Sequence, residues 1–210
     1  MNTYIESLNW RYATKKFDSS KKISATTLAN LLEAIRLTAS SYGLQPYNVL
    51  IIDNPEVRKQ LQPVSWGQSQ IVDASHLIVF AHKTRIEEDW IDQYLELVSD
   101  TREIPLDALH GYGDFMKSKL LDLSIETQAN WAAKQTYISM GNLLSAAATM
   151  KIDACPIEGF EPEDYNRILG LSAKGLSACL VAALGYRAKE DETQHAKKVR
   201  RSTAKLFTHI

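Results

Sequence analysis

Residues 177–186 read Ser-Ala-Cys-Leu-Val-Ala-Ala-Leu-Gly-Tyr, a continuous apolar run that predicts a buried strand. A second run, His-Leu-Ile-Val-Phe-Ala-His at residues 76–82, is apolar at every interior position. A strand of this kind is covered on both faces of its sheet. Residues 47–52, Tyr-Asn-Val-Leu-Ile-Ile, are short and rich in β-branched side chains and predict a third strand. These strands would build the central sheet.

Segments with helical periodicity separate the expected strands. Ser24 is a suitable N-cap for a helix that continues to Arg36, and Asn54-Pro55 would cap and open another. Helices are also predicted for residues 3–10, 85–100, 106–123, 128–150 and 162–169, and residues 154–160 are expected to form a loop. Strands that alternate with longer helices indicate an α+β or α/β protein. With 210 residues and no repeat, we expect a single domain over residues 1–210.

Charge is balanced in total but unevenly distributed. The 24 basic and 25 acidic residues offer no overall field for nucleic acid or an anionic membrane. Residues 1–22 carry a net charge of +3, residues 197–210 carry +5, and the intervening chain carries −9. Both ends are therefore basic and the middle is acidic.

The two cysteines, Cys155 and Cys179, show neither a CxxC motif nor a metal-ligand spacing. We therefore expect no metal site, no disulfide framework and a reducing, cytoplasmic compartment. No signal-peptide pattern is visible at the N-terminus. The longest uncharged run has 16 residues and contains several polar ones, whereas a membrane span needs roughly 20 apolar residues. The sequence thus predicts a protein without membrane or nucleic-acid partners.

Signatures of common hydrolases and nucleotide-binding loops are absent from the sequence. There is no GxSxG, HExxH or GxxxxGK[ST] motif, and the five histidines do not cluster. This absence of an obvious acid–base set favours a bound cofactor as the carrier of any reaction.

The basic ends offer a candidate anion site. Arg11 and Lys15 lie four residues apart near the N-terminus, and Lys198 and Arg200 lie two apart near the C-terminus. Guanidinium and ammonium groups that converge on one point would suit a phosphate monoester. The alternative is that they are solvated surface charges, which charge counting alone favours.

Five segments, taken in order, resemble the FMN-dependent nitroreductase family of the oxygen-insensitive NAD(P)H nitroreductase and dihydropteridine reductase type. They are Arg-Tyr-Ala-Thr-Lys-Lys-Phe at 11–17, Ser-Ser-Tyr-Gly-Leu-Gln-Pro at 40–46, Asp-Ala-Ser at 73–75, Trp-Ala-Ala-Lys-Gln at 131–135 and Pro-Ile-Glu-Gly-Phe at 156–160. Lys198-Val-Arg200 closes the set. Each motif alone is weak, but their joint order and spacing are specific.

The resemblance implies an α+β, nitroreductase-like fold with a central mixed, mostly antiparallel sheet flanked by helices. It also implies a homodimer centred on the helix at 128–150. The implied FMN-binding residues are Arg11, Tyr12, Ala13, Lys15, Ser40, Ser41, Gly43, Gln68, Gln70, Pro156, Ile157, Glu158, Gly159, Lys198 and Arg200.

These positions would have different roles. Arg11, Lys198 and Arg200 would hold the phosphate end of FMN, and Lys15 would approach the N1–C2 side of the flavin, where a cation favours the reduced form. Backbone N–H groups of residues 156–159 would point at N5 and O4, and residues 40–43 would come from the second subunit. The expected lid or substrate-face residues are Tyr42, Phe115 and Met116.

The sequence departs from the family pattern at several positions. Ala13 stands where relatives often have Ser, and Gly43 where they often have Asn. Gly67 and Gln70 replace a frequent Asn and Lys, so Gln68 or Gln70 would have to bond the pyrimidine edge without supplying a cation. These changes bear on substrate and nicotinamide preference more than on flavin binding.

The implied reaction uses one site twice. NADH or NADPH would transfer a hydride to flavin N5 and leave, and a nitroaromatic, quinone or similar acceptor would then take two electrons in a ping-pong sequence. No side chain is expected to act as a general acid or base. Two other interpretations stay open: pteridine, enone or flavin reduction, dehalogenation or oxygen-dependent flavin destruction on the same scaffold, and a non-enzymatic flavin-binding or sensing protein.

Overall fold

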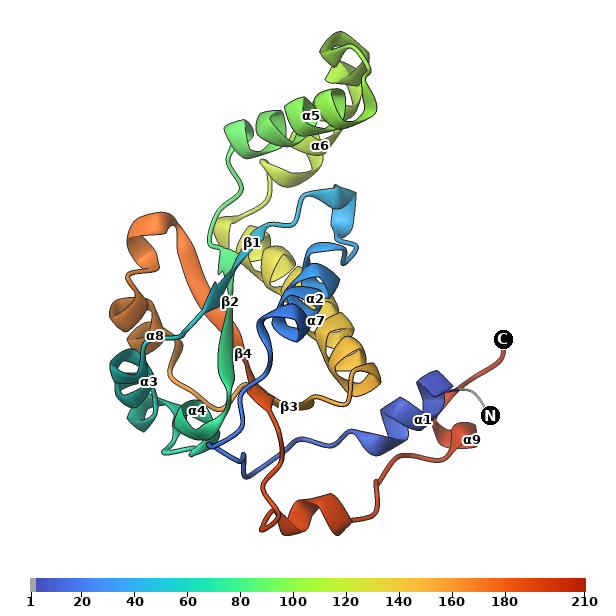
Figure 1. Ribbon diagram of the computed structural model, residues 1–210. Coiled ribbons are helices and arrows are strands. Elements are labelled where there is room, and N and C mark those ends of the chain that lie inside the picture. The colour runs from blue at the N-terminus through green and yellow to red at the C-terminus, as the bar shows by residue number, and fades with distance from the viewer. Residues whose placement is uncertain (1–2) are drawn as a thin grey trace.

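The computed structural model describes residues 3–210 and is built around one antiparallel sheet (Figure 1). Its strands are β1 (Tyr47–Ile51), β2 (His76–Lys83), β3 (Asp153–Ile157) and β4 (Leu176–Gly185), in the order β1-β2-β4-β3. The three strands predicted from sequence are β1, β2 and β4. Every neighbouring pair is antiparallel, and the one parallel contact in the described chain is the isolated bridge between Ala13 and Ala154. The predicted α+β class is confirmed.

Side chains of β2 and β4 alternate between two buried layers, which explains why neither strand carries a charge in its interior. On one face, Val79 and Val181 belong to a core that includes residues of α3 (Pro55–Leu61), α4 (Gln70–Asp73) and α8 (Pro162–Leu169). On the other, Phe80 and Leu180 pack with residues of α2 (Ala25–Arg36) and α7 (Ile125–Thr149). Figure 1 shows these two helical groups on opposite sides of the sheet. Both central strands are therefore covered on both faces, as their composition predicted.

The helix caps agree with the sequence signals. The Ser24 side chain accepts a hydrogen bond from the Thr27 N–H at the start of α2, and Asn54 caps α3, which Pro55 opens. The long helix α7 begins at Ile125, three residues before the predicted start, because Ser124 is its N-cap. The remaining helices are α1 (Thr3–Trp10), α5 (Glu88–Arg102), α6 (His110–Leu120) and α9 (Thr203–Leu206).

The prediction of a loop at residues 154–160 is wrong for its first half. Residues 153–157 form β3, which pairs antiparallel with β4 from Asp153 opposite Gly185 to Ile157 opposite Val181. Pro156 suggested a loop because proline cannot donate to a ladder hydrogen bond. An edge strand tolerates proline because one of its sides has no ladder to complete, and β3 is the edge of this sheet.

Helices α5 and α6 project away from the sheet as a separate pair (Figure 1). They enclose a third apolar cluster that includes Leu44, Ile91 and Leu95. Every helix among residues 3–210 falls short of the length or hydropathy that crossing a bilayer requires.

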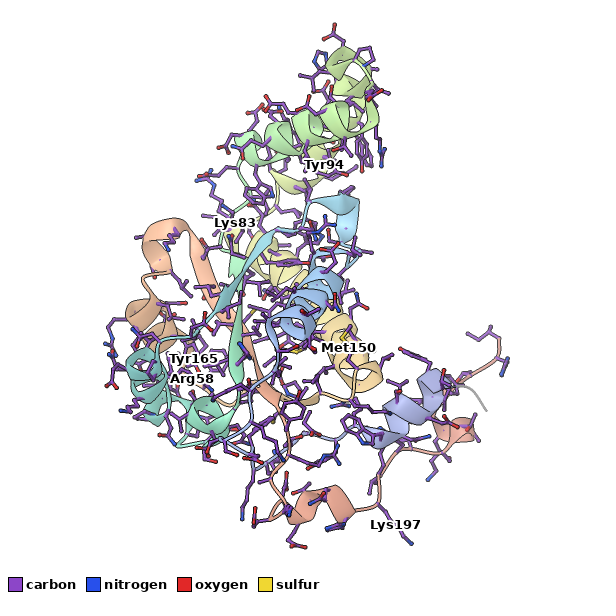
Figure 2. The ribbon with its side chains drawn as sticks, viewed as in Figure 1. Arg58, Lys83, Tyr94, Met150, Tyr165 and Lys197 are labelled. Carbon is purple, nitrogen blue, oxygen red and sulfur yellow. The ribbon has the colours of Figure 1, made fainter. Side chains whose placement is uncertain are left out.

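Arg58 is a buried charge that ties α3 to the end of α4 (Figure 2). Its guanidinium donates to the carbonyl oxygens of Ile71 at 2.7 Å, Ala74 at 2.6 Å and Ser75 at 3.4 Å. Ile71 lies within the four-residue helix α4, and Ala74 and Ser75 follow it, so Arg58 satisfies carbonyl acceptors that the short helix leaves without a helical partner.

We expect Arg58→Ala to lower the free energy of unfolding by about 3 kcal/mol, since hydrogen bonds from a charged donor contribute about 1.5–3 kcal/mol each and buried carbonyls would be left without partners. Urea denaturation followed by circular dichroism measures the change. The control is Lys59→Ala, which removes an exposed cation paired with Glu56 and should leave stability nearly unchanged. Equal effects of the two substitutions would contradict the assignment.

Candidate functional site

The first basic loop, residues 11–17, lies along the outer edge of β3. Ala13 forms a parallel bridge with Ala154, and the Thr14 N–H donates to the Ala154 carbonyl oxygen at 3.4 Å. At the other end of the loop, Phe17 bridges to Arg187, just beyond β4. The loop therefore occupies the side of β3 that β4 leaves free, and the backbone direction of β3 sets its path.

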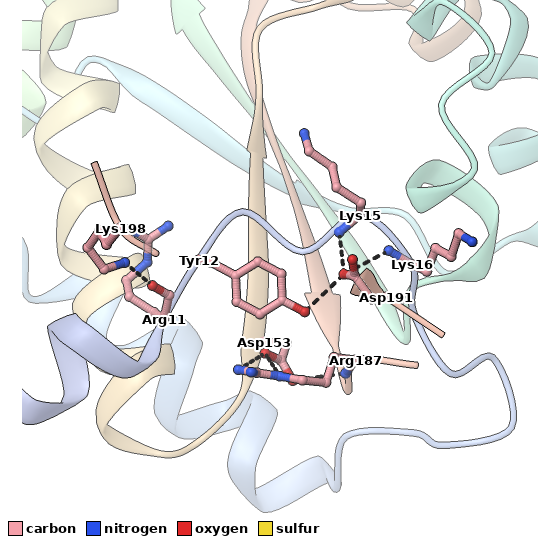
Figure 3. Close-up of polar contacts among 8 residues, drawn as sticks. All are labelled: Arg11, Tyr12, Lys15, Lys16, Asp153, Arg187, Asp191 and Lys198. Carbon is pink, nitrogen blue, oxygen red and sulfur yellow. Dashed lines mark hydrogen bonds and ion pairs between the residues drawn. The ribbon is translucent and has the colours of Figure 1, made fainter. Parts of the chain in front are cut away.

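Three cations from the two ends of the chain meet at this loop. The Lys198 ammonium donates to the carbonyl oxygen of Arg11 (Figure 3), and Arg200 lies close enough to repel both charges. Burial lowers the pKa of Arg11, and the positive charge of Arg200 lowers it further. Burial lowers the pKa of Lys198, and the positive charges of Arg11 and Arg200 lower it further. We call Arg11, Lys198 and Arg200 the cation cluster.

The cation cluster has unused capacity to bind an anion. Within residues 3–210, none of its members forms an ion pair with an Asp or Glu side chain. The Arg11 Nε is buried and finds no hydrogen-bond partner in the same part of the chain. A buried donor without a partner costs about 1–3 kcal/mol, and like charges in proximity add to the cost. An oxyanion at this position would relieve both.

Lys15 and Gln70 extend the site along β3. Burial raises the pKa of the Cys155 thiol, while the positive charges of Lys15 and Arg11 act in the opposite direction. The Gln70 side-chain amide lies 4.0 Å from the Cys155 sulfur. Three predicted site residues from separate motifs thus lie near Cys155 of β3: Arg11, Lys15 and Gln70. The predicted segment 156–159 begins in the same strand.

The segment after β3 is fixed by its neighbours. Gln68 donates its side-chain amide to the carbonyl oxygens of Gly159 at 2.8 Å and Ser65 at 3.1 Å, so this donor positions the loop. A Cβ at Gly159 would lie 2.8 Å from the Trp66 ring, so a larger residue would require that ring to move. The Glu158 carboxylate accepts from the Tyr137 hydroxyl, and this hydrogen bond raises the pKa of Tyr137 to about 12.

Residues 40–43, which were expected to cover the cofactor, lie away from the cation cluster in the folded chain. The Ser41 N–H donates to Gln135 on α7 at 2.8 Å, and Ser40 accepts from the Gln45 N–H. Helix α1, which leads into the basic loop, contacts α7 at Ser145, about 15 Å further along the helix axis. Within one chain, therefore, the structure does not bring Ser40, Ser41 and Gly43 to the cation cluster (Figure 1).

Gly43 explains one departure from the family pattern. Its φ is +81°, a conformation that favours glycine, and a Cβ would lie 2.4 Å from the Tyr94 hydroxyl. An asparagine there would require the Tyr94 side chain to move. A cavity of about 620 Å³ lies beside Gly43, between α2, β1 and α5, and does not include the cation cluster.

Two of the three expected substrate-face residues lie together. The Tyr42 ring is 6.4 Å from that of Phe115 and 6.3 Å from that of Trp131, and Phe115 is half-exposed. Met116, by contrast, is fully buried in the apolar cluster of α5 and α6. Adjacent helical positions point about 100° apart, so Phe115 can face solvent while its neighbour Met116 faces the core. The expectation that Met116 faces a substrate is therefore corrected.

Sequence reasoning missed the residues that hold the basic loop. Tyr12 was expected at the cofactor, but its hydroxyl donates to Asp191 at 2.9 Å, and Arg187 lies over its ring (Figure 3). Nothing in the sequence separates Asp191 from its acidic neighbours Glu190 and Glu192. Only the folded chain shows which carboxylate turns inward.

Comparison with known proteins agrees with this geometry. The model of the "Nitroreductase family" matches residues 8–186. A relative from Bacillus subtilis, "Putative NAD(P)H nitroreductase YfkO", is 37% identical in an alignment 200 positions long that covers 89% of this chain and 89% of its own. A "putative NAD(P)H:FMN oxidoreductase" from Staphylococcus epidermidis has a similar structure, with a TM-score of 0.88, 18% identity and coverage of 100% of this chain and 97% of its own.

A further similar structure is a "putative nitroreductase in complex with FMN" from Exiguobacterium sibiricum, with a TM-score of 0.85, 18% identity and coverage of 99% of this chain and 97% of its own. The structural likenesses establish the fold, and the family match and the sequence identity to YfkO establish the kinship. The chain is therefore a member of the nitroreductase family of oxidoreductases.

Proposed function

We propose that this protein is an FMN-dependent NAD(P)H oxidoreductase that passes two electrons to electron-poor small molecules such as nitroaromatics and quinones. The observation that carries the proposal is the cation cluster around the unpartnered Nε of Arg11. Supporting it are the similarity to YfkO, which is named as an NAD(P)H nitroreductase, and the FMN complex of the Exiguobacterium protein. The free thiols of Cys155 and Cys179 fit the reducing cytoplasm in which we place the protein.

The residues fit FMN in charge and in hydrogen-bonding capacity. Arg11, Lys198 and Arg200 would bind its phosphate, since guanidinium groups offer paired donors and ammonium a point charge. Lys15 would face the N1–C2 side of the ring, Gln70 the pyrimidine edge, and the backbone of residues 156–159 the N5 and O4 side. When bound, FMN supplies the hydride and electron chemistry, so the protein needs no side chain as general acid or base.

A second copy of the chain would complete the site. Ser40, Ser41 and Gly43 do not reach the cation cluster of their own chain, so we propose that they cover the cofactor of a partner. The exposed side of α7 presents Tyr137 and Ile138, each about half-exposed, and the largely exposed Leu37 lines the same surface hollow as Ile138. Apolar side chains gathered on one helix face are typical of a protein–protein interface. We therefore place the dimer contact on α7.

Tyr42 and Phe115 are proposed to form the face on which NAD(P)H and the acceptor bind in turn. Their edge-to-face contact leaves aromatic surface exposed, which suits flat ligands. Met116 would support Phe115 from below. Two other functions fit the same residues: reduction of pteridines, enones or free flavin, and flavin binding without turnover.

Removal of the two guanidinium groups should weaken flavin binding. We expect Arg11→Ala with Arg200→Ala to raise the Kd for FMN by about 100-fold or more, because two charge-assisted contacts contribute about 3 kcal/mol in total. Fluorescence titration of the flavin-free protein measures it. The control, Lys16→Ala with Arg201→Ala, removes two charges from the same segments and should change Kd only slightly. Unchanged binding in the first variant would refute the cation-cluster assignment.

Reduction and turnover separate the candidate functions. The purified protein should be yellow, and anaerobic mixing with NADH or NADPH should bleach it rapidly, whereas a flavin-binding sensor would stay yellow. Initial rates at several acceptor concentrations should give parallel lines in double-reciprocal plots, because one site serves both substrates in turn. Intersecting lines would indicate a ternary complex and rule out the shared site. An anaerobic acceptor panel distinguishes nitroaromatics and quinones from pteridines and enones.

A charge on the exposed side of α7 should disrupt the dimer. Ile138→Glu is expected to yield a monomer in sedimentation velocity and to lower flavin retention, because burying a carboxylate without a partner is strongly unfavourable. Ala173→Glu introduces the same charge at an exposed turn before β4 and should leave both properties unchanged. A dimeric Ile138→Glu variant that retains flavin would place the interface elsewhere.

A further inference from the structure

Asp191 is a buried carboxylate that receives four hydrogen bonds. Its Oδ2 accepts from the backbone N–H of Lys15 at 2.8 Å, the backbone N–H of Lys16 at 3.2 Å and the Tyr12 hydroxyl at 2.9 Å (Figure 3). Its Oδ1 accepts from the Thr193 N–H at 3.1 Å. Only 1% of Asp191 is exposed. Burial opposes ionisation, but the hydrogen bonds outweigh it and hold the pKa of Asp191 below its ordinary value.

The Asp191 carboxylate binds the backbone of Lys15 and leaves its side chain free. Figure 3 shows the Lys15 side chain extending away from Asp191. Lys15 forms no ion pair within the part of the chain that is described, and its side chain is exposed. A carboxylate 176 residues later in the chain thus orders the Lys15 backbone without pairing with its charge.

A second set of contacts holds the same turn from below. The Arg187 guanidinium lies 4.4 Å from the Trp10 ring and 4.6 Å from the Tyr12 ring, and it pairs with Asp153 at 2.6 Å. Because Asp153 is the first residue of β3, this ion pair connects the turn to the sheet. The Tyr12 ring is therefore held by Arg187 while its hydroxyl is held by Asp191. The turn at residues 12–16 is ordered by the segment after β4.

We infer that Asp191 is a positioning residue: by binding the amides of Lys15 and Lys16 and the Tyr12 hydroxyl, it holds the uncompensated Lys15 ammonium against the flavin and so raises the reduction potential of bound FMN. The inference rests on the proposed FMN site. Through Lys15, Asp191 would raise the reduction potential of FMN, although its own negative charge acts to lower that potential. A nearby negative charge by itself would disfavour the reduced, anionic cofactor and lower the potential.

The test uses the FMN-loaded protein and Asp191→Asn. If Asp191 acts through Lys15, the two-electron midpoint potential should fall, because the loosened turn no longer holds the ammonium in place. We expect the midpoint potential to fall by about 30 mV. For a two-electron couple, this shift corresponds to a tenfold change in how much more tightly the protein binds reduced FMN than oxidised FMN. A rise in potential would show that only the charge of Asp191 matters, and an unchanged potential would show no role. Either result overturns the inference.

Controls separate positioning from general stability. Asp18→Asn removes a partly exposed carboxylate that bonds Ser20 and Lys21 in the next stretch of chain, and it should leave the potential unchanged. Lys15→Met should lower the potential by itself, and adding Asp191→Asn should then have little further effect, since both act through one ammonium. An additive loss in the double variant would contradict the inference. If Asp191→Asn does not fold, Tyr12→Phe, which removes one donor, should lower the potential to a smaller extent.

A measurement without flavin makes the two proposals separable. In the flavin-free protein, the amide hydrogens of Lys15 and Lys16 should exchange slowly in the wild type and at least tenfold faster in Asp191→Asn. If the wild type binds no FMN, the proposed function fails whatever the exchange result. If FMN binds but exchange at these amides does not accelerate, the positioning role of Asp191 fails alone.

Discussion

The placement of residues 11–17 along the free side of β3 is the constraint on which the candidate site depends. The Ala13–Ala154 bridge aligns the loop with the strand, and the contacts of Phe17 and Asp18 with residues just beyond β4 fix its other end. Arg11 and Lys15 then lie near Cys155 of β3, which Gln70 of α4 also contacts, and residues of the loop and of α4 share one apolar core. None of these side chains would be near another without β3 at the sheet edge.

The positive charge of the site follows from the partners that the nearby carboxylates bind. Asp191 binds backbone amides, Asp153 pairs with Arg187, and Glu158 accepts from Tyr137. These three carboxylates are thus engaged by groups outside the cation cluster. The positive charges of Arg11, Lys198 and Arg200 remain uncompensated, although the chain as a whole is nearly neutral. Selective use of the local acids creates a positive site on a protein without a positive field.

The sequence predicted the elements that local patterns determine. The double-sided apolar runs of β2 and β4 and the caps at Ser24 and Asn54 act through neighbours in the chain, and all were found where expected. β3 was missed because Pro156 is compatible with a strand only at an edge, and edge position is a property of the sheet. Asp191 was missed for a related reason: three adjacent acids are equivalent until the fold turns one of them inward.

The cation cluster joins Arg11 to Lys198, 187 residues later in the chain. A protein emerging from the ribosome N-terminus first would expose Arg11 long before its partners are synthesised, and contacts so distant in sequence form late in folding. The anion site is consequently among the last parts of the molecule to be assembled. A growing chain that has not yet reached Lys198 and Arg200 has the sheet but no complete place to receive a phosphate. Loading of a cofactor there would therefore follow the synthesis of these two residues.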